Sequence, residues 1–150
     1  MAVDVSGEER IEAPVDKVWA GLNDPEILKE CIPGCESLEK TSDTELAAVV
    51  SLKIGPIKAR FNGAVELTNL NPPHSYTIQG EGKGGIAGFA KGGADVTLTE
   101  DGPDATILAY TAKADVGGKM AQLGSRLIQS TSKKLAAQFF SDFNDKVSAK

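Results

Sequence analysis

The side chains that could carry out catalytic chemistry are few in this sequence and stand in unpromising contexts. The single histidine, His74, follows Pro72-Pro73 in a predicted turn, so a solvent-exposed or strand-start residue is a better interpretation than a general base. Cys31 and Cys35 are the only cysteines, and no second histidine is present to activate either thiol as a nucleophile. No pair of carboxylates has a spacing that would set two carboxyl pKa values apart. We therefore predict no catalytic residue.

The same residues do not predict a metal site. Two thiols and one imidazole cannot supply the four protein ligands of a structural zinc ion without help from carboxylates. A disulfide between Cys31 and Cys35 is conceivable across Pro33-Gly34, but a cytosolic chain keeps its thiols reduced. We expect two semi-buried free thiols and no metal.

Seven glycines between Gly80 and Gly93 form the most unusual segment of the chain. The run GEGKGG at residues 80–85 formally matches the dinucleotide-binding pattern G-x-G-x-x-G. That pattern requires a strand before it and a helix after it, because the helix amino terminus holds the pyrophosphate. Residues 86–98 instead indicate another strand, and Lys83 lacks the context of a phosphate-binding loop. A phosphate site is therefore not the favoured interpretation.

The shape of the sheet explains these glycines better than a phosphate site does. Small residues at alternate positions of two strands leave the inward face of a sheet almost without side chains: Gly80 and Gly82 on one strand, and Gly88, Ala90, Gly92 and Ala94 on the next. Either a covering helix packs very close to the sheet there, or the missing volume is a ligand cavity.

The elements that must position these residues follow from the hydrophobic periodicity. Residues 3–12 alternate apolar and polar side chains, which predicts an antiparallel strand with one wet face. Gly7 and Glu9 fall at positions of this strand where apolar residues are expected, so either Gly7 marks a bulge or Glu9 points inward. Two short helices are predicted to begin near Pro14 and Pro25, since proline is favoured in the first helical turn.

The last element is predicted to be one amphipathic helix from about Lys119 to Val147, because apolar side chains recur there at steps of three and four. At about 1.5 Å per residue it would be roughly 43 Å long. Its first half presents small residues, whereas its second half presents Phe139, Phe140 and Phe143. We expect a dry plug at the carboxyl end and room at the amino end.

Between Cys35 and Val116, apolar and polar residues alternate with a period of two residues, and turn residues separate about six strands. The order of elements predicts an α+β fold for one domain spanning residues 1–150. It is a seven-stranded curved antiparallel sheet, with two short helices and one long C-terminal helix enclosing an apolar cavity. Candidates for polar groups in the interior are Glu9, Tyr76, Tyr110 and Thr131.

Charge and hydropathy narrow the class of protein. Net charge is −5, yet six Lys and Arg stand against two Asp from Lys119 to Lys150. An acidic body with a mildly basic final helix argues against nucleic-acid binding, which requires a pronounced basic face. No apolar stretch is long enough to span a bilayer, and the amino terminus lacks the features of a signal peptide. We expect a cytoplasmic protein.

Four segments resemble the CoxG family of carbon monoxide dehydrogenase subunits, which belongs to the START and birch-pollen-allergen-like superfamily. They are PVDKVW at residues 14–19, LNDP at 22–25, CIPGCE at 31–36 and GKGGIAGFAKG at 82–92. The resemblance covers almost the whole chain and implies the helix-grip fold. It also implies a non-catalytic accessory protein of molybdenum hydroxylases of the carbon monoxide dehydrogenase type.

Some relatives are understood to bind a quinone in the cavity, which implies a lipophilic ligand here, with no other cofactor. By strand and helix parity, the ligand would contact Leu28, Ile32, Phe61, Tyr76, Ile86, Phe89, Met120, Leu123, Gly124, Leu127 and Thr131. Longer relatives continue into a membrane-seeking tail, whereas this sequence ends at Lys150. The resemblance thus implies at most transient contact with the inner face of the cell membrane, through the basic final helix.

Two other functions stay open at this point. Relatives on the same fold include polyketide cyclases and aromatases, and an enzyme of that kind would have to use Glu9, Tyr76 and Tyr110. Alternatively, the cavity is vestigial and the protein is a pure docking module for hydroxylase subunits.

Overall fold

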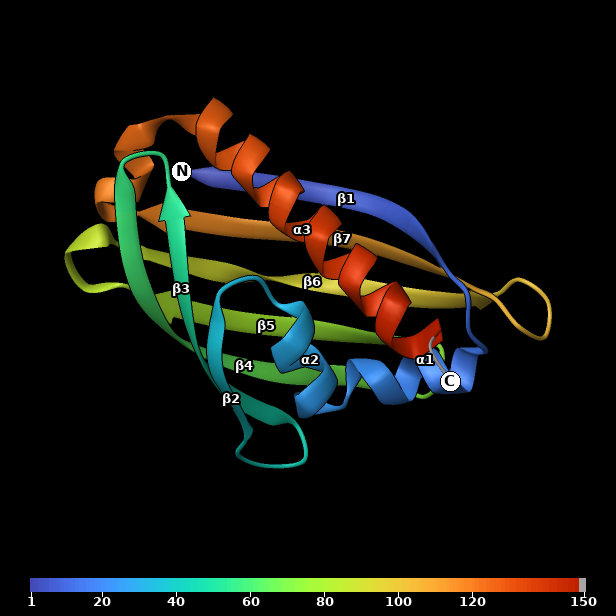
Figure 1. Ribbon diagram of the computed structural model, residues 1–150. Helices are drawn as coiled ribbons and strands as arrows, with labels where there is room; N and C mark the ends of the chain where they lie inside the picture. Colours follow the sequence, from blue (N-terminus) through green and yellow to red (C-terminus); the bar gives the residue numbers. More distant parts are fainter. Residues whose placement is uncertain (149–150) are drawn as a thin grey trace.

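Seven antiparallel strands form one curved sheet in the computed structural model, which describes residues 1–148 (Figure 1). The strand order is β1-β7-β6-β5-β4-β3-β2, so every pair is consecutive in sequence except β1 with β7. The strands are β1 (Ala2–Ile11), β2 (Cys35–Lys40), β3 (Glu45–Ile54), β4 (Ile57–Asn71), β5 (Ser75–Lys83), β6 (Phe89–Glu100) and β7 (Thr106–Gly117). The predicted α+β class and the seven-stranded sheet are confirmed.

Helices cover the concave face of this sheet. The two short helices α1 (Val15–Leu22) and α2 (Pro25–Cys31) follow β1, and the long helix α3 (Ser125–Ser148) crosses the face diagonally (Figure 1). Helix α2 begins where expected, because the Asp24 side chain accepts a hydrogen bond from the Glu26 backbone N–H at 3.0 Å. Both short helices pack against α3 near its carboxyl end.

The final helix is shorter than predicted. Residues Gly118–Leu123 form a 3₁₀ helix, η2, and the α-helix begins only at Ser125. The cause is glycine backbone geometry: Gly118 has φ 80° and Gly124 has φ 94°, values that do not belong to an α-helix. Helix α3 is therefore about 36 Å long rather than 43 Å.

The predicted strand over residues 86–98 is also interrupted at its start. Gly85–Ala87 forms a short 3₁₀ turn, η1, and β6 begins at Phe89. Gly88 has φ 120°, and a Cβ on it would lie 2.0 Å from the carbonyl oxygen of Gly117. Gly88 is thus required by close contact between two turns, and it is not an inward strand position.

The first strand contains no bulge, because β1 pairs with β7 without a register shift. Gly7 lies opposite Tyr110, and a Cβ at Gly7 would lie 3.1 Å from the Tyr110 hydroxyl oxygen. Glu9 has the same parity and is half-buried. Of the two interpretations of this strand, the inward-facing Glu9 is the one that holds.

Two apolar clusters lie at opposite ends of the concave face. The first, under α1 and the carboxyl end of α3, has Ile11, Val18, Leu108 and Phe143 fully buried at its centre. The second, under η2 and the start of α3, contains Val3, Phe61, Ala87, Val116, Met120 and Ile128. We call them the closed end and the open end.

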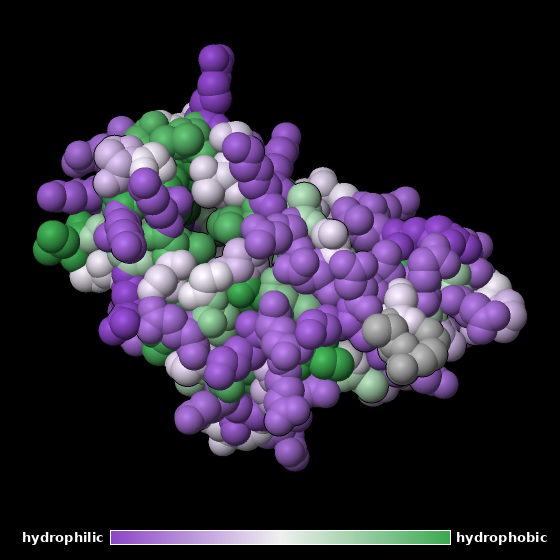
Figure 2. Space-filling model, viewed as in Figure 1, coloured by the Kyte–Doolittle hydropathy of each residue, from purple (hydrophilic) through white to green (hydrophobic). Residues whose placement is uncertain are grey.

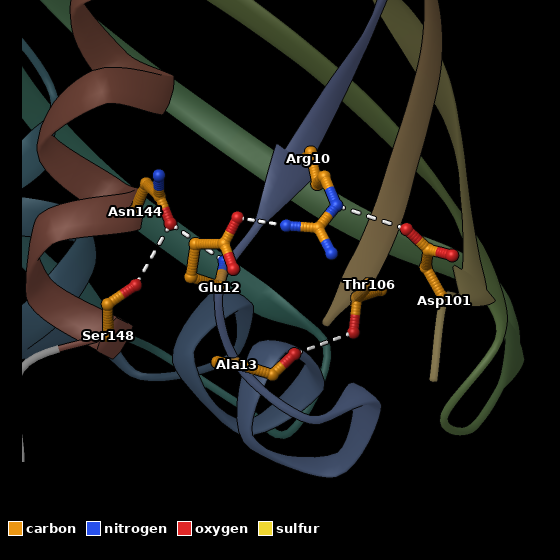
Figure 3. Close-up of polar contacts among 7 residues, drawn as sticks. All are labelled: Arg10, Glu12, Ala13, Asp101, Thr106, Asn144 and Ser148. Carbon is orange, nitrogen blue, oxygen red and sulfur yellow. Dashed lines mark hydrogen bonds and ion pairs between the residues drawn. The ribbon is translucent and has the colours of Figure 1, made fainter. Parts of the chain in front are cut away.

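Polar contacts tie the closed end together (Figure 3). The hydroxyl of Thr106 is fully buried and donates to the carbonyl oxygen of Ala13 at 2.9 Å. The Glu12 backbone N–H donates to the side-chain oxygen of Asn144 at 2.9 Å, which joins the segment after β1 to α3. Arg10 forms ion pairs with Glu12 and, at 3.0 Å, with Asp101.

Candidate ligand-binding cavity

A cavity of about 660 Å³ lies between α3 and the concave face of the sheet, between the two apolar clusters. This volume is within the range of small-molecule sites. Inward side chains of all the strands except β2 contribute to the wall, together with Ile32 after α2 and Met120 of η2. From α3 come Ile128, Ser132, Leu135, Ala136, Phe139 and Phe140.

Missing side chains create part of this space. A Cβ added at Gly63 or Gly82 would meet no atom closer than 3.8 Å or 3.9 Å respectively, so these glycines open onto the cavity. Gly92 is different, because a Cβ there would lie 2.0 Å from the carbonyl oxygen of Lys113 on β7. The space of the cavity accounts for Gly63 and Gly82, whereas close approach of backbone between strands accounts for Gly92.

Aromatic rings of α3 close the cavity on the side of the closed end. The Phe139 ring packs edge-on against Phe140 at 5.1 Å between centroids and stacks with Phe143 at 5.8 Å. The expected aromatic plug at the carboxyl end of the helix is present. On the other side, Met120 of η2 and Ile128 of α3 line the wall, whereas the small residues Gly117, Gly118, Ala121, Gly124 and Ser125 do not, so the predicted room at the amino end does not come from them.

Polar groups aimed into the cavity are few. Tyr110 lines it, and its ring stacks on Phe140 at 4.9 Å between centroids. Burial raises the pKa of the Tyr110 hydroxyl, and the nearby Glu9 carboxylate raises it further, so the hydroxyl stays protonated at neutral pH. The Ser132 hydroxyl donates to the Ile128 carbonyl oxygen at 2.8 Å, which leaves its oxygen free to accept.

Charged residues on the cavity wall do not make the interior of the cavity polar. Glu81, Lys91 and Lys113 contribute to the wall from strand positions whose side chains alternate to the outer face. Within residues 1–148, no group of three or more His, Cys, Asp or Glu side chains could hold a metal ion. Both cysteines are free, with Cys31 fully buried and Cys35 half-buried. The site is therefore suited to binding an apolar molecule with one or two polar atoms.

Three of the eleven predicted ligand contacts, Ile32, Phe61 and Met120, line the cavity. Tyr76 does not, although its strand position faces inward, because that end of β5 lies within the closed-end cluster, where its ring packs against Trp19 at 5.3 Å. Leu28 is likewise buried outside the cavity wall.

The other predicted contacts belong to the open end or to its surface. Leu123 and Leu127 face the β3–β4 turn, where a Cβ on Gly55 would lie 4.0 Å and 3.0 Å from their methyl groups. Gly124 ends η2, and Thr131 is half-buried, with its neighbour Ser132 on the cavity wall instead. Ile86 lies in η1 and is 83% exposed, whereas Phe89 is 40% exposed because it begins β6 at a position of outward parity.

The wall residues that sequence reasoning missed come mainly from β1, β3 and β7. The sequence did carry a signal for them, because on each of these strands the wall residues alternate with residues that face outward. The set comprises Val3, Val5, Ala48, Val50, Leu52, Ile54, Ala112, Ala114 and Val116, whereas Tyr110 was among the polar groups expected in the interior.

In the START and Bet v 1-like class, a long helix covers the concave face of a curved antiparallel sheet, and an apolar cavity lies between the two. Solved structures agree: a START superfamily protein from Mycobacterium smegmatis has a TM-score of 0.73 at 14% identity, covering 96% of each chain. The Zhui aromatase/cyclase from Streptomyces sp. R1128 has a TM-score of 0.72 at 10% identity, covering 98% of this chain and 94% of that one. At such identities the likeness shows the fold alone.

The family is narrower than this class. The family model for CoxG, a subunit of carbon monoxide dehydrogenase, matches residues 7–148, and the chain belongs to this family. A crystal structure of a conserved protein from Geobacillus kaustophilus is 33% identical, with a TM-score of 0.90, and the match covers 96% of this chain and 94% of that one. A search of the curated proteins finds no match. The family that the sequence motifs indicated is confirmed.

Proposed function

We propose that this protein binds a lipophilic small molecule, a quinone, in the cavity and serves a carbon monoxide dehydrogenase of the molybdenum hydroxylase type as an accessory protein. The observation that carries the proposal is the cavity of about 660 Å³, walled by apolar side chains, with Tyr110 and Ser132 as its inward polar groups. The family's description supports the link to carbon monoxide dehydrogenase.

The chemistry of a quinone fits this wall. A quinone ring is flat and apolar and carries two carbonyl oxygens, which accept hydrogen bonds. The Tyr110 hydroxyl is protonated at neutral pH, as an ordinary tyrosine is, and its raised pKa keeps it so, which means that it can donate to one of these oxygens. The rings of Phe139 and Phe140 offer faces for offset stacking. The chain holds and orients the ligand in this proposal, and it makes or breaks no covalent bond.

Native mass spectrometry after gentle purification, with quinones of several tail lengths offered, tests the proposal. We expect a one-to-one complex with the wild-type protein and its loss in Gly63→Val, which fills cavity space. Ala64→Val is the matched control, because Ala64 is the next residue on β4 and is exposed on the other face. Persistent absence of a bound quinone, or equal binding by Gly63→Val, would contradict the proposal.

One observation favours a second function, an enzyme of the aromatase/cyclase kind. Glu9 and Tyr110 lie close enough on neighbouring strands for the Glu9 carboxylate to raise the Tyr110 pKa, and Tyr110 lines the cavity. A polyketide analogue that cyclises with wild-type protein, but not with Tyr110→Phe or Glu9→Gln, would establish this activity. Unchanged substrate with the wild-type protein and with both variants would contradict this second function.

A further inference from the structure

The floor of the cavity is a channel of small residues that crosses the strands diagonally beneath α3. Strand pairing places Ala48 of β3 opposite Gly63 of β4, and Gly63 opposite Gly82 of β5. The channel continues through residues of β5, β6 and β7 that pair in the same way and also line the cavity: Gly80, Ala90, Gly92, Ala94, Ala112 and Ala114. The open space therefore runs from β3 to β7, across the strands and not along them.

Larger side chains border this channel on both sides. Phe61 lies on one side, two residues from Gly63 along β4, and Val65 and Ile78 lie on the other. Since neighbouring strands are about 4.8 Å apart, the four spacings from β3 to β7 give a length of about 19 Å. A channel of this shape suits an elongated ligand.

The two ends of the channel differ in polarity. At β7 it ends beside Tyr110, whose hydroxyl oxygen lies over Gly7 of β1, 3.1 Å from the place of a Cβ there. Among residues 1–148 this hydroxyl has no hydrogen-bond partner, so it is free to donate to a ligand. At β3 the wall beside Ala48 consists of apolar side chains, including Ile32 and Val50.

The apolar end of the channel is also the less covered end. Helix α3 begins beside β1, where the Gln129 side chain donates to the Asp4 carbonyl oxygen, and it makes only slight contact with β3. Figure 2 shows apolar surface in the region between the start of α3 and the β3–β4 hairpin. An apolar chain can leave the channel there.

We propose that the cavity encloses the ring and roughly two or three isoprenoid units of its quinone, with the ring at Tyr110 and the remaining tail leaving between α3 and β3. This inference rests on the proposed function. Each isoprenoid unit adds four carbon–carbon bonds of about 1.5 Å in zigzag, or about 5 Å. A channel of about 19 Å thus holds a ring of about 6 Å and roughly two or three units.

The opposite orientation is unfavourable. It would place the ring at the β3 end, where Ala48, Val50 and Leu52 offer no side-chain donor to the carbonyl oxygens. A polar group that is buried without a hydrogen bond costs free energy. It would also leave the Tyr110 hydroxyl facing an apolar tail.

Titration calorimetry with quinones that share one ring and differ in tail length tests the enclosed length. We expect the affinity of the full chain to rise by roughly tenfold or more for each of the first two units, because apolar surface is buried. From three units to four the affinity should change by less than roughly twofold, since the added unit stays outside. An affinity that is already complete with the ring alone, or that rises evenly to four units, would overturn the proposal.

Substitutions at the two ends test the orientation. Ala48→Leu should lower the affinity for the three-unit quinone by roughly tenfold and that for the tailless quinone by less than roughly twofold. Ala47→Leu is the matched control, because Ala47 is the preceding residue of β3 and lies on the outer face, opposite Ala64. Tyr110→Phe should weaken both quinones by the same factor. A larger effect of Ala48→Leu on the tailless quinone would place the ring at β3 and overturn the proposal.

A bulky amide group at the end of the tail gives a measurement that needs no variant. On a four-unit tail the group should change the affinity by less than roughly twofold, because it lies outside the cavity. On a one-unit tail it should abolish binding, because the channel has no room for it. Loss of binding in both cases would contradict a tail that leaves the cavity.

The outcomes separate this inference from the proposed function. If no quinone of any tail length binds, the proposed function itself is wrong. If quinones bind but their affinities follow neither the tail-length dependence nor the effects of the substitutions, only the enclosed length and the orientation are wrong.

Discussion

The two ends of the concave face are built from the same sheet and the same helix, yet they differ in packing and charge. At the closed end, Phe143 is fully buried, and Thr106 and Asn144 join three elements by hydrogen bonds. At the open end, glycines with positive φ form the turns, and Ile86 stands in water. The comparison teaches that buried rings and hydrogen bonds fix the closed end, whereas glycine turns shape the open end and leave an apolar side chain exposed there.

Truncation of a buried ring should have the largest effect. Phe143→Ala should lower the free energy of unfolding by about 3–5 kcal/mol, because it leaves a cavity in the closed-end cluster. Phe89→Ala at the open end should cost clearly less, since the ring is already 40% exposed. Urea denaturation of both variants measures the difference, and equal losses would break the distinction between the two ends.

Two glycines one strand apart should respond differently to a methyl group. Gly92→Ala should cost about 1–3 kcal/mol, because the new Cβ meets the Lys113 carbonyl and the backbone must shift. Gly82→Ala should leave stability nearly unchanged and reduce the affinity for a bulky ligand. Thermal unfolding and ligand titration of the pair measure both effects, and a stable Gly92→Ala protein would refute the backbone argument.

Removal of the Tyr110 hydroxyl from the cavity should have a moderate effect on ligand binding and little effect on folding. Tyr110→Phe should weaken quinone binding by about 3–10-fold through loss of one hydrogen bond, since the ring remains stacked on Phe140. Isothermal titration with a short-tailed, water-soluble quinone measures the change. Unaltered affinity would show that the ligand does not use this hydroxyl.

The smallest effect should be a dependence of stability on alkaline pH. Burial raises the pKa of the Tyr76 hydroxyl above its ordinary value of about 10. The neutral form is favoured in the folded protein, so this contribution is complete below the unfolded pKa and is lost as the pH rises from about 10 toward the folded pKa. Comparison of wild-type protein with Tyr76→Phe across that range should show a steeper loss in the wild type. Parallel curves would contradict the assignment.

Much of the fold could be predicted because the relevant signals are local. The alternation in residues 57–70 appears directly in β4, and Asp24 before Pro25 caps α2 as such residues do. The places of the predicted ligand contacts depend on more than strand parity. Tyr76 and Ile78 share a parity on β5, yet only Ile78 lines the cavity. Parity gives the face of a sheet and not the position along it.

The sequence by itself determined the order of the strands and α-helices, the wet and dry faces of the first strand, and the family, because periodicity and motifs are properties of neighbouring residues. Only the tertiary structure decided where the cavity lies, since that depends on where α3 crosses the sheet. It also separated Gly82, which opens onto space, from Gly92, which allows two strands to approach. The exposure of Ile86 was likewise decided there, because Gly85 and Gly88, both with positive φ, place this predicted strand residue in the turn η1.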